Sequence, residues 1–261
     1  MLLVSALAQG QVSNGRTNHI EKVKTLSEKL RWHDEAGQEK YAATKHEVTR
    51  QVLNEIDAFV SDSFQPSSAT TELVGAGLDA LLGHKSGDVM HDLAFSVDLP
   101  HGHFLIAGIE LSRGGDAIAD DAISFRAYKA VGNRLVFAAN TDNFSDSSLV
   151  DLHAEALSGL PAVGEFWFMA MAEVPPQSPT TVALRLYAFD GEKFRTVWEP
   201  RNIIAAGVGK AIEATTGGFV VDSLFDPTGG AAHSPSVVIH EQYVLTVGEP
   251  EKVAEWRTGI Q

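Results

Sequence analysis

The stretch LRLYAFDGEKFRTVW, residues 184–198, decides the fold because it predicts two short strands joined by a tight turn. Apolar and polar residues alternate on both sides of Asp190-Gly191, and period two is the spacing of one strand face. The Asp-Gly pair favours a two-residue hairpin, since glycine tolerates the positive φ of a primed turn. We therefore expect strands at residues 182–189 and 193–198, paired antiparallel.

This hairpin belongs to a repeat with an offset of about 59 residues, and a fixed period in this range is typical of stacked or radial repeat architectures. Arg126 and Tyr128 precede Arg185 and Tyr187 by that offset. In such architectures neighbouring units cover each other's apolar faces. A second matched set is Leu135, Phe194 and Val253, and the units begin near Asp92, Asp151 and Lys210.

Each unit contains four segments with strand periodicity, the second of them the most apolar. The sequence therefore predicts three four-stranded antiparallel sheets. The expected strands are 92–97, 104–111, 123–128 and 134–139 in the first unit; 151–156, 166–172, 182–189 and 193–198 in the second; and 210–215, 219–225, 237–245 and 252–257 in the third.

The segment before the repeats predicts helices. Apolar residues spaced by threes and fours mark one face from Ile20 to Leu30 and another from Tyr41 to Phe59, and a short helix is expected at 72–82. A Pro/Ser/Thr-rich linker lies between the last two. The expected organisation is a leader at 1–17, a helical region with its linker at 18–90, and a three-repeat β domain at 91–261.

The units at 91–258 resemble the four-stranded blades of a β-propeller. The resemblance implies a mainly β, α+β fold: a helical hairpin followed by three blade-like repeats. Closed propellers use four to eight blades, so three would leave two open flanks. The helical hairpin could cover one flank, two chains could complete a ring, or the units could pack differently. A β-trefoil or a three-faced β-prism remains the alternative fold.

Charge and composition exclude several partners. The net charge is −14, and residues 88–261 carry 23 acidic against 11 basic side chains. Such a surface repels the phosphate backbone, so we expect no nucleic-acid partner. The longest apolar run, Phe166 to Ala172, is too short to span a bilayer, which predicts no membrane insertion. The chain has no cysteine, which excludes disulfides and thiolate chemistry.

The first residues, Met1 to Ala8, resemble the end of a secretory signal, with a short apolar stretch and Ala6-x-Ala8 as a cleavage pattern. A basic n-region is lacking, which is consistent with a start further upstream. We expect a secreted or periplasmic protein.

Two groups of residues are candidate metal ligands. His101 and His103 would point to one side of an extended strand, as two ligands of one ion could. Asp142 and Asp146 lie in an acidic loop whose carboxylates suit calcium. Solvated turn residues are the default explanation for both groups. The sequence therefore predicts no cofactor, with Ca²⁺ as the alternative.

Repeated polar and aromatic residues are candidate ligand-binding residues. A repeated Arg–Tyr pair could line a ligand channel, while a cross-strand ion pair is the structural alternative. An exposed Trp would anchor a partner, whereas a buried one would belong to the core between units. The candidates are Arg126, Tyr128, Arg185, Tyr187, Trp167 and Trp198.

No nucleophile, base and orienting group occur together at a believable spacing. We therefore expect a non-catalytic, exported binding or scaffolding module that recognises a protein or a glycan through loops of the repeat domain. A purely structural homodimer is a further possibility. The enzymatic alternative is a metal- or carboxylate-dependent hydrolase where the first strands converge, using Asp92, Asp151, Glu155 and His153.

Overall fold

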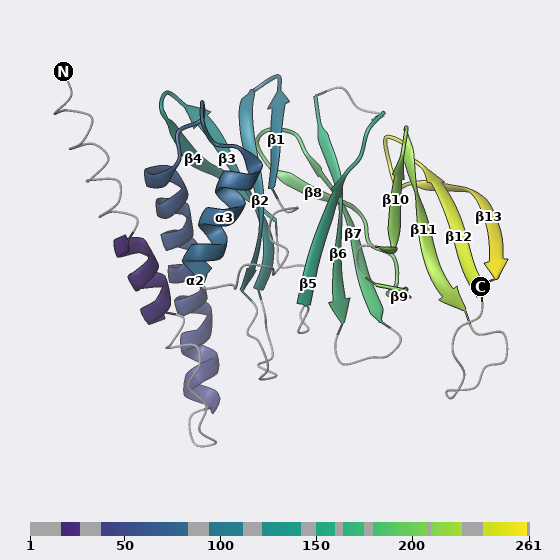
Figure 1. The fold of residues 1–261 in the computed structure, drawn as a ribbon, viewed down its shortest axis with the longest axis horizontal. Helices are drawn as coiled ribbons and strands as arrows, with labels where there is room; N and C mark the ends of the chain where they lie inside the picture. The colour runs from purple at the N-terminus through teal and green to yellow at the C-terminus, as the bar shows by residue number, and fades with distance from the viewer. Residues whose placement is uncertain are drawn as a thin grey trace.

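Among the described residues, three helices and three antiparallel sheets make up the computed structural model (Figure 1). The helices α2 (Gln38–Ser63) and α3 (Thr71–Leu82) precede all the strands. The structure describes residues 17–26, 38–82, 94–111, 122–141, 150–159, 164–174, 180–207, 210–225 and 237–259, without the side chains of 38–46, Glu110, Ala122, Val150 and Asp151.

Each sheet is a meander whose strands pair in chain order. The first sheet contains β1 (Ala94–Leu99), β2 (Gly102–Leu111), β3 (Ala122–Val131) and β4 (Arg134–Asn140). The second contains β5 (Val150–Ala156), β6 (Phe166–Val174), β7 (Thr181–Phe189) and β8 (Phe194–Trp198), and the short β9 (Ile203–Ile204) pairs with β7. The third contains β10 (Ile212–Thr215), β11 (Gly218–Phe225), β12 (Val237–Val244) and β13 (Glu251–Gly259). All twelve predicted strands are confirmed; β9 was missed because two residues carry no periodicity.

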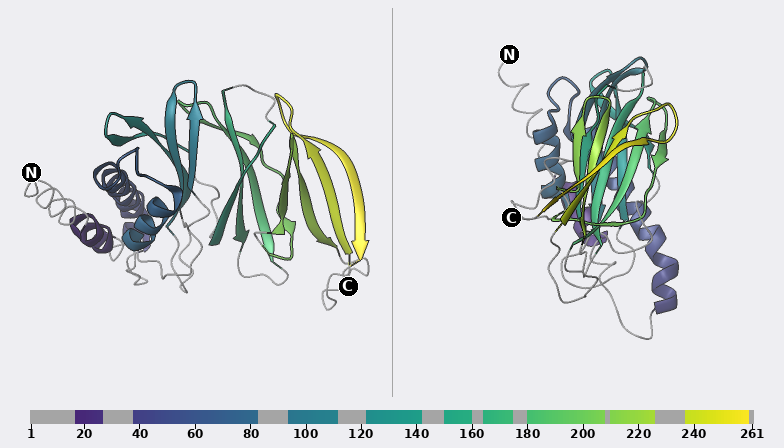
Figure 2. Two further views of the ribbon diagram at one scale, coloured as in Figure 1. Left: turned by 45° about the horizontal axis from the view of Figure 1, so that its top comes forward. Right: turned by 90° about the vertical axis from the view of Figure 1, so that its right-hand side faces the viewer.

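The sheets stand in a row (Figure 2), and clusters of buried apolar side chains lie between neighbouring layers. One core cluster joins the helices to the first sheet, the next joins the first and second sheets, and the last joins the second and third. Phe125 of β3 contacts Phe168 of β6 with ring centroids 4.7 Å apart, and Trp198 of β8 contacts Phe219 of β11 at 5.5 Å. The layers therefore depend on one another for their dry faces, as the repeat predicted.

Alternation along β2 shows how one strand serves two layers. Phe104 and Ile106 pack toward the second sheet, while Leu105 and Ala107 pack toward the helices. Neighbouring side chains on a strand point to opposite faces, so a strand between two layers must be apolar on both. Fully burying one such Phe contributes about 2 kcal/mol.

The helices cover the outer side of the first sheet. Ile56 and Phe59 of α2 and Val74 and Leu78 of α3 are buried in the same cluster as residues of β2. Thr70 caps α3, because its Oγ1 accepts a hydrogen bond from the backbone N of Leu73 at 3.2 Å. One of the two expected open flanks is therefore closed by the helical region.

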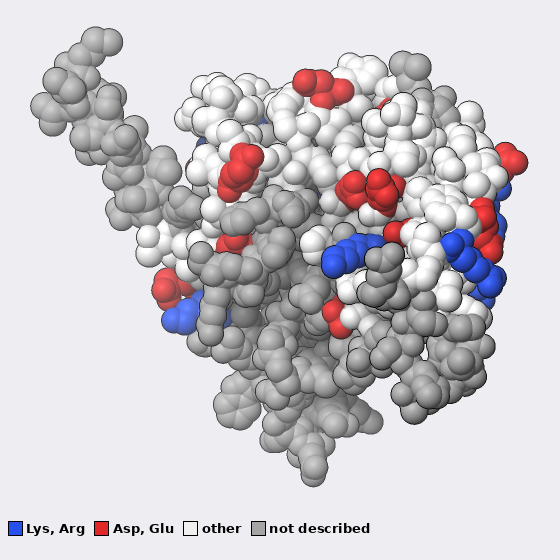
Figure 3. All heavy atoms as spheres, turned by 45° about the vertical axis from the view of Figure 1, so that its right-hand side comes forward, with Lys and Arg blue, Asp and Glu red and all other residues white. Residues whose placement is uncertain are grey.

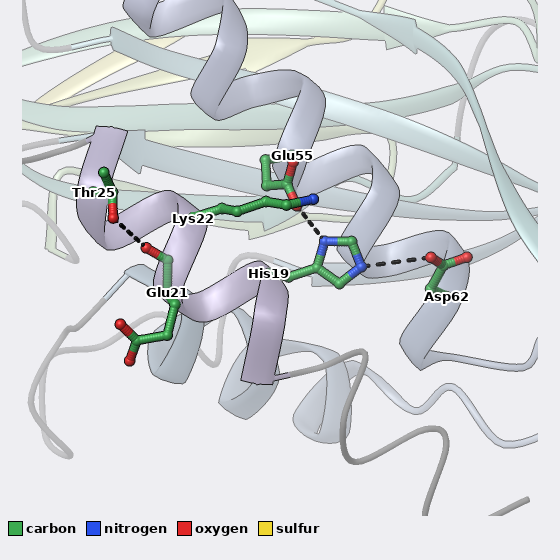
Figure 4. Close-up of polar contacts among 6 residues, drawn as sticks. All are labelled: His19, Glu21, Lys22, Thr25, Glu55 and Asp62. Carbon is green, nitrogen blue, oxygen red and sulfur yellow. Dashed lines mark hydrogen bonds and ion pairs between the residues drawn. The ribbon is translucent and has the colours of Figure 1, made fainter.

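A helix at residues 17–26 packs on α2 through a buried histidine (Figure 4). Nδ1 of His19 lies 2.5 Å from Oε1 of Glu55, and Nε2 lies 3.5 Å from Oδ2 of Asp62. Lys22 Nζ also lies 3.2 Å from Glu55 Oε1. Val23 is buried beside these groups, and Ile20 and Leu26 pack against the same cluster, so apolar and polar contacts together fix this helix.

The strand registers allow the three sheets to be aligned with one another. Tyr128, Tyr187 and Tyr243 each follow the point where the third strand shifts its pairing with the fourth. The offset from Tyr187 to Tyr243 is shorter than the offset from Tyr128 to Tyr187. The prediction that Val253 matches Leu135 and Phe194 was therefore wrong: Val253 is the residue skipped at the bulge, and the third unit is shorter.

The backbone hydrogen bonds between strands join strands of the same sheet. Among the described residues, the bridge between sheets is one parallel pair, Ser158 with Thr216. A trefoil barrel would need paired strands from different units. The fold is mainly β, with three antiparallel four-stranded sheets, and its pairing favours separate stacked sheets over a barrel.

Candidate functional site

Three polar side chains on neighbouring strands of the third sheet form one hydrogen-bonded set. His240 of β12 lies between Asp222 of β11 and Thr258 of β13. Its Nδ1 is 2.7 Å from Asp222 Oδ1, and its Nε2 is 2.7 Å from Thr258 Oγ1. When Nδ1–H donates a hydrogen bond to the Asp222 carboxylate, Nε2 of the neutral ring accepts a hydrogen bond from the Thr258 hydroxyl. Asp222 therefore fixes the orientation and tautomer of the ring.

Strand register explains why these residues meet. Asp222, His240 and Trp256 are direct partners across β11, β12 and β13, so their side chains lie on one face of the sheet. The ring of Trp256 stacks on His240 with centroids 5.0 Å apart and planes 12° apart. Trp256 is 42% exposed on the last strand of the sheet.

This face, here called the outer face, is the side of the third sheet turned away from the second. Phe219, Val221 and Tyr243 point the other way, into the core with the second sheet. None of the three core clusters of described residues includes a residue of the outer face. The outer face consists of Glu213, Thr215, Gly218, Val220, Asp222, Leu224, Val238, His240, Gln242, Val244, Glu251, Ala254, Trp256 and Thr258.

The Asp–His–Thr connectivity matches that of a nucleophile activated by an oriented base. Its surroundings differ from those of a catalytic site, because Thr258 is exposed and the Asp222 side chain is 31% exposed. Electrostatic stabilisation of a transition state is strong where water is excluded. An open sheet face with an exposed Trp is better suited to recognition than to acyl transfer.

The edge of the same sheet carries paired charges. Lys252 Nζ lies 2.8 Å from Glu241 Oε1 and 3.0 Å from Glu255 Oε2. These contacts raise the pKa of Lys252 and lower that of Glu255. At the right of Figure 3 acidic and basic groups lie next to one another, while other acidic groups in this view stand apart from basic ones. The charge along this edge is therefore largely compensated locally.

The first predicted Arg–Tyr pair holds a helix to the first sheet. Arg126 donates from Nε and Nη2 to the two carboxylate oxygens of Asp57 on α2, at 2.8 and 2.5 Å. The Tyr128 hydroxyl donates to Asp57 Oδ1 at 3.0 Å. Burial disfavours the Arg126 charge, yet the bonds to Asp57 raise its pKa overall. Burial and the neighbouring carboxylate raise the pKa of Tyr128 well above 10.0.

The second pair lies between the first and second sheets. Nη1 of Arg185 donates to the Tyr187 hydroxyl at 3.3 Å, and Nη2 pairs with Glu199. Tyr187 is buried against Phe125 and Phe168, and burial raises its pKa. Both arginines are therefore in ion pairs, but not in the cross-strand pairs that were expected, because Asp57 lies on α2 and Glu199 follows the end of β8.

The two candidate tryptophans belong to the core between the second and third sheets. Trp167 is fully buried and donates from Nε1 to Glu165 Oε2 at 2.7 Å. Trp198 is half-buried against Phe219 and Tyr243. Recognition through a Trp therefore rests on Trp256, which the sequence analysis did not select.

His101 and His103, the candidate metal ligands, make different contacts in the structure. His103 Nδ1 lies 2.9 Å from Asp98 Oδ1, and its Nε2 lies 3.4 Å from Ser96 Oγ, whereas His101 is an exposed turn residue. Within the described part of the chain, no three His, Asp or Glu side chains form a group that could hold a metal ion. Asp142 and Asp146, the candidate calcium ligands, lie outside the described residues.

The first-strand hydrolase residues are only partly described. Asp92 and the Asp151 side chain lie outside the described set. Glu155 accepts a hydrogen bond from the backbone N of Ala214 on β10 at 3.3 Å, which joins the second and third sheets. His153 is half-buried on β5. Glu155 thus acts as a link between layers.

A sequence signal for the outer face does exist. When the three sheets are aligned by strand register, the position of His240 in the third sheet corresponds to Phe125 in the first and Leu184 in the second. The position of Asp222 corresponds to Gly108 and Met171. Polar residues therefore replace apolar or small ones in the third unit, where none of the core clusters of the described residues covers this face. The signal was missed because the sequence spacing between the first two units was also applied to the third. The third unit is shorter, so that spacing misaligns it by three positions.

None of the helices that the structure describes combines the length and the apolar character needed to cross a bilayer. Comparison with protein-family models, curated proteins and solved structures finds no match to this chain.

Proposed function

We propose that this protein is a non-catalytic binding module, exported from the cytoplasm, that recognises a protein or a glycan through the outer face of the third sheet. Blade-like stacking of equivalent sheets supplies the rigid frame. One observation carries the proposal: the same face is covered by the next sheet in the first and second units, while in the third it bears an exposed Trp.

Side chains on the outer face fit a recognition surface. Trp256 supplies a rigid aromatic anchor, and Val244, also exposed, extends the apolar area. Asp222, His240 and Thr258 supply polar atoms held by mutual hydrogen bonds, so little side-chain entropy is lost on binding. A mixed apolar and polar surface of this kind is typical of interfaces that form and separate.

Export rests on the signal-like Ala6-x-Ala8 pattern, and the excess of acidic side chains argues against nucleic acid as the ligand. Proteins and glycans are both recognised by aromatic side chains beside hydrogen-bonding groups. The outer face offers both kinds of group at one place, which makes it the surface to test.

The test compares Trp256→Ala with Leu73→Ala. Leu73 is 46% exposed on α3, far from the third sheet in the stack, so it controls for loss of an exposed apolar side chain. The full chain is applied to a glycan array and, with crosslinking, to extracellular proteins. We expect Trp256→Ala to weaken saturable binding at least about tenfold, as for a hot-spot Trp. Equal binding by both variants and the parent would refute the proposal.

A further inference from the structure

We infer that the ligand of the outer face is a basic peptide segment of another protein, bound with an Arg or Lys side chain over the Trp256 ring. The inference rests on the proposed function, since it takes the outer face as the recognition surface and names the chemistry of what binds there. Three features carry it: the charge of the face, the free side of the Trp256 ring, and the size of the face.

Among the described residues, the outer face carries acidic side chains and no Lys or Arg. Strand register puts Glu213 of β10, Asp222 of β11 and Glu251 of β13 on this side of the sheet. Glu213 and Glu251 are exposed, and within the described part of the chain neither has an ion-pair partner. Asp222 already has His240 as its partner, so it adds to the negative potential of the face without being left unsatisfied. A face of this charge attracts a cationic ligand.

The basic residues of the same four strands lie on the opposite side of the sheet. They are Lys252 and Arg257 of β13, and strand register puts both on the side of Tyr243. There Lys252 pairs with Glu241 and Glu255, and Nη2 of Arg257 lies 3.9 Å from Oε1 of Glu255. Acid and base therefore compensate each other on that side. On the outer face the compensating positive charge has to come from the ligand.

Trp256 offers a cation one free ring face. Its other face packs on His240, with the ring planes 12° apart, and the side chain is 42% exposed. The π-face of a Trp attracts an ammonium or, more often, a guanidinium group. Asp222 lies at the same level two strands away, about 10 Å across the sheet. A cation over Trp256 therefore lies within the field of the acidic face, and the ring that receives it is already held in place.

The size of the face favours a short segment over a folded partner. Four strands about 4.8 Å apart and up to about 26 Å long give a footprint of about 500 Å². Stable interfaces between folded proteins bury about 800 Å² per partner. An extended peptide covers about 26 Å with about eight residues, so such a segment fits within the face. We expect reversible binding with a Kd in the micromolar range.

Fluorescence anisotropy of a labelled peptide of about eight residues, with arginine at every second position, tests the inference on the full chain. The reference peptide has glutamine in place of each arginine. We expect the arginine peptide to bind saturably and the glutamine peptide not to bind. Trp256→Ala should weaken binding of the arginine peptide at least about tenfold, and Leu73→Ala should leave it unchanged.

A pair of matched double variants separates the outer face from the overall negative charge. Glu213→Gln with Glu251→Gln removes two charges from the outer face. Glu21→Gln with Glu192→Gln removes two charges from exposed positions in the helix at 17–26 and in the turn between β7 and β8. We expect the first pair to weaken binding of the arginine peptide about fivefold or more, and the second pair less than about twofold. Circular dichroism confirms that each variant is folded.

The outcomes that overturn the inference differ in what they say about the proposed function. Equal weakening by the two double variants, or peptide binding that is indifferent to Trp256→Ala, shows that the peptide does not bind at the outer face. Binding of a glycan or an uncharged protein that depends on Trp256, without binding of the arginine peptide, refutes the basic segment and leaves the binding module standing. If no ligand binding depends on Trp256, the proposed function fails as well.

Discussion

Replacing Asp57 with Ala tests how the helical region is fixed to the first sheet. Asp57 accepts two hydrogen bonds from Arg126 and one from Tyr128. The side chains of Arg126 and Asp57 are 6% and 16% exposed, so water can hardly replace the lost carboxylate. The substitution leaves a buried guanidinium without its counter-charge and a buried phenol without its acceptor.

The expected cost follows from that burial. Breaking a buried ion pair by removing one partner costs about 3–5 kcal/mol. Arg126 keeps its contact over the Phe137 ring, 4.5 Å from the centroid, which compensates part of the loss. We therefore expect a loss of about 3 kcal/mol in the free energy of unfolding. Asp62→Ala on the same helix is the control, because Asp62 is 53% exposed and its loss should cost below about 1 kcal/mol.

Urea unfolding followed by circular dichroism measures both variants. With a slope of about 3 kcal/mol per molar urea, Asp57→Ala should lower the midpoint by about 1 M. A double-mutant cycle with Arg126→Ala should show coupling of at least about 1 kcal/mol. A midpoint shift no larger than that of Asp62→Ala, or additive single effects, would refute the view that this ion pair fixes the helices to the sheets.

Three further predictions follow from other contacts. Burial raises the pKa values of Tyr128 and Tyr187 above 10.0, so their contribution to stability is complete below pH about 10 and is lost as pH rises. Absorbance at 295 nm should show these two tyrosines ionising only as the chain unfolds. Their reversible titration in the folded state would contradict this. Burial alone would raise the pKa of Asp190, but hydrogen bonds from the backbone N of Lys193 and Glu192 lower it below 3.8. The contribution of Asp190 to stability is therefore present above pH about 4 and lost in stronger acid. Asp190→Asn should flatten the acid limb of the curve of stability against pH, and an unchanged limb would disprove this. His19→Ala should remove hydrogen-exchange protection from residues 17–26 while the sheets keep theirs; unaltered protection would show that the remaining contacts, such as that of Val23, are enough to hold this helix.

The order of strands and helices could be predicted from the sequence because it depends on local periodicity. Alternation along β2 and β6 and the Asp190-Gly191 turn are readable one residue at a time. The packing of the helices on the first sheet was left open between three possibilities. It depends on long-range contacts, such as Asp57 with Arg126, that no spacing in the sequence displays.

The candidate site was harder to predict, since it depends on strand register. Asp222, His240 and Thr258 lie 18 residues apart from one neighbour to the next and meet only because three strands pair with one particular alignment. Shifting register by one residue would send His240 to the opposite face. Because one constant sequence offset was assumed for every unit, His240 was not aligned with Phe125 and Leu184. The replacement of these apolar residues by a polar one in the third unit was therefore missed.

The most direct test of the central claim is hydroxyl-radical footprinting of the full chain, read out by mass spectrometry at Trp256 and at Trp167. Trp167 is fully buried and serves as the internal reference. The outer face is expected to be accessible in the free chain and covered on binding, so Trp256 should be modified strongly in the free chain and become protected when a ligand is bound. Strong protection of Trp256 in the isolated monomer, or modification that no partner reduces, would contradict the account.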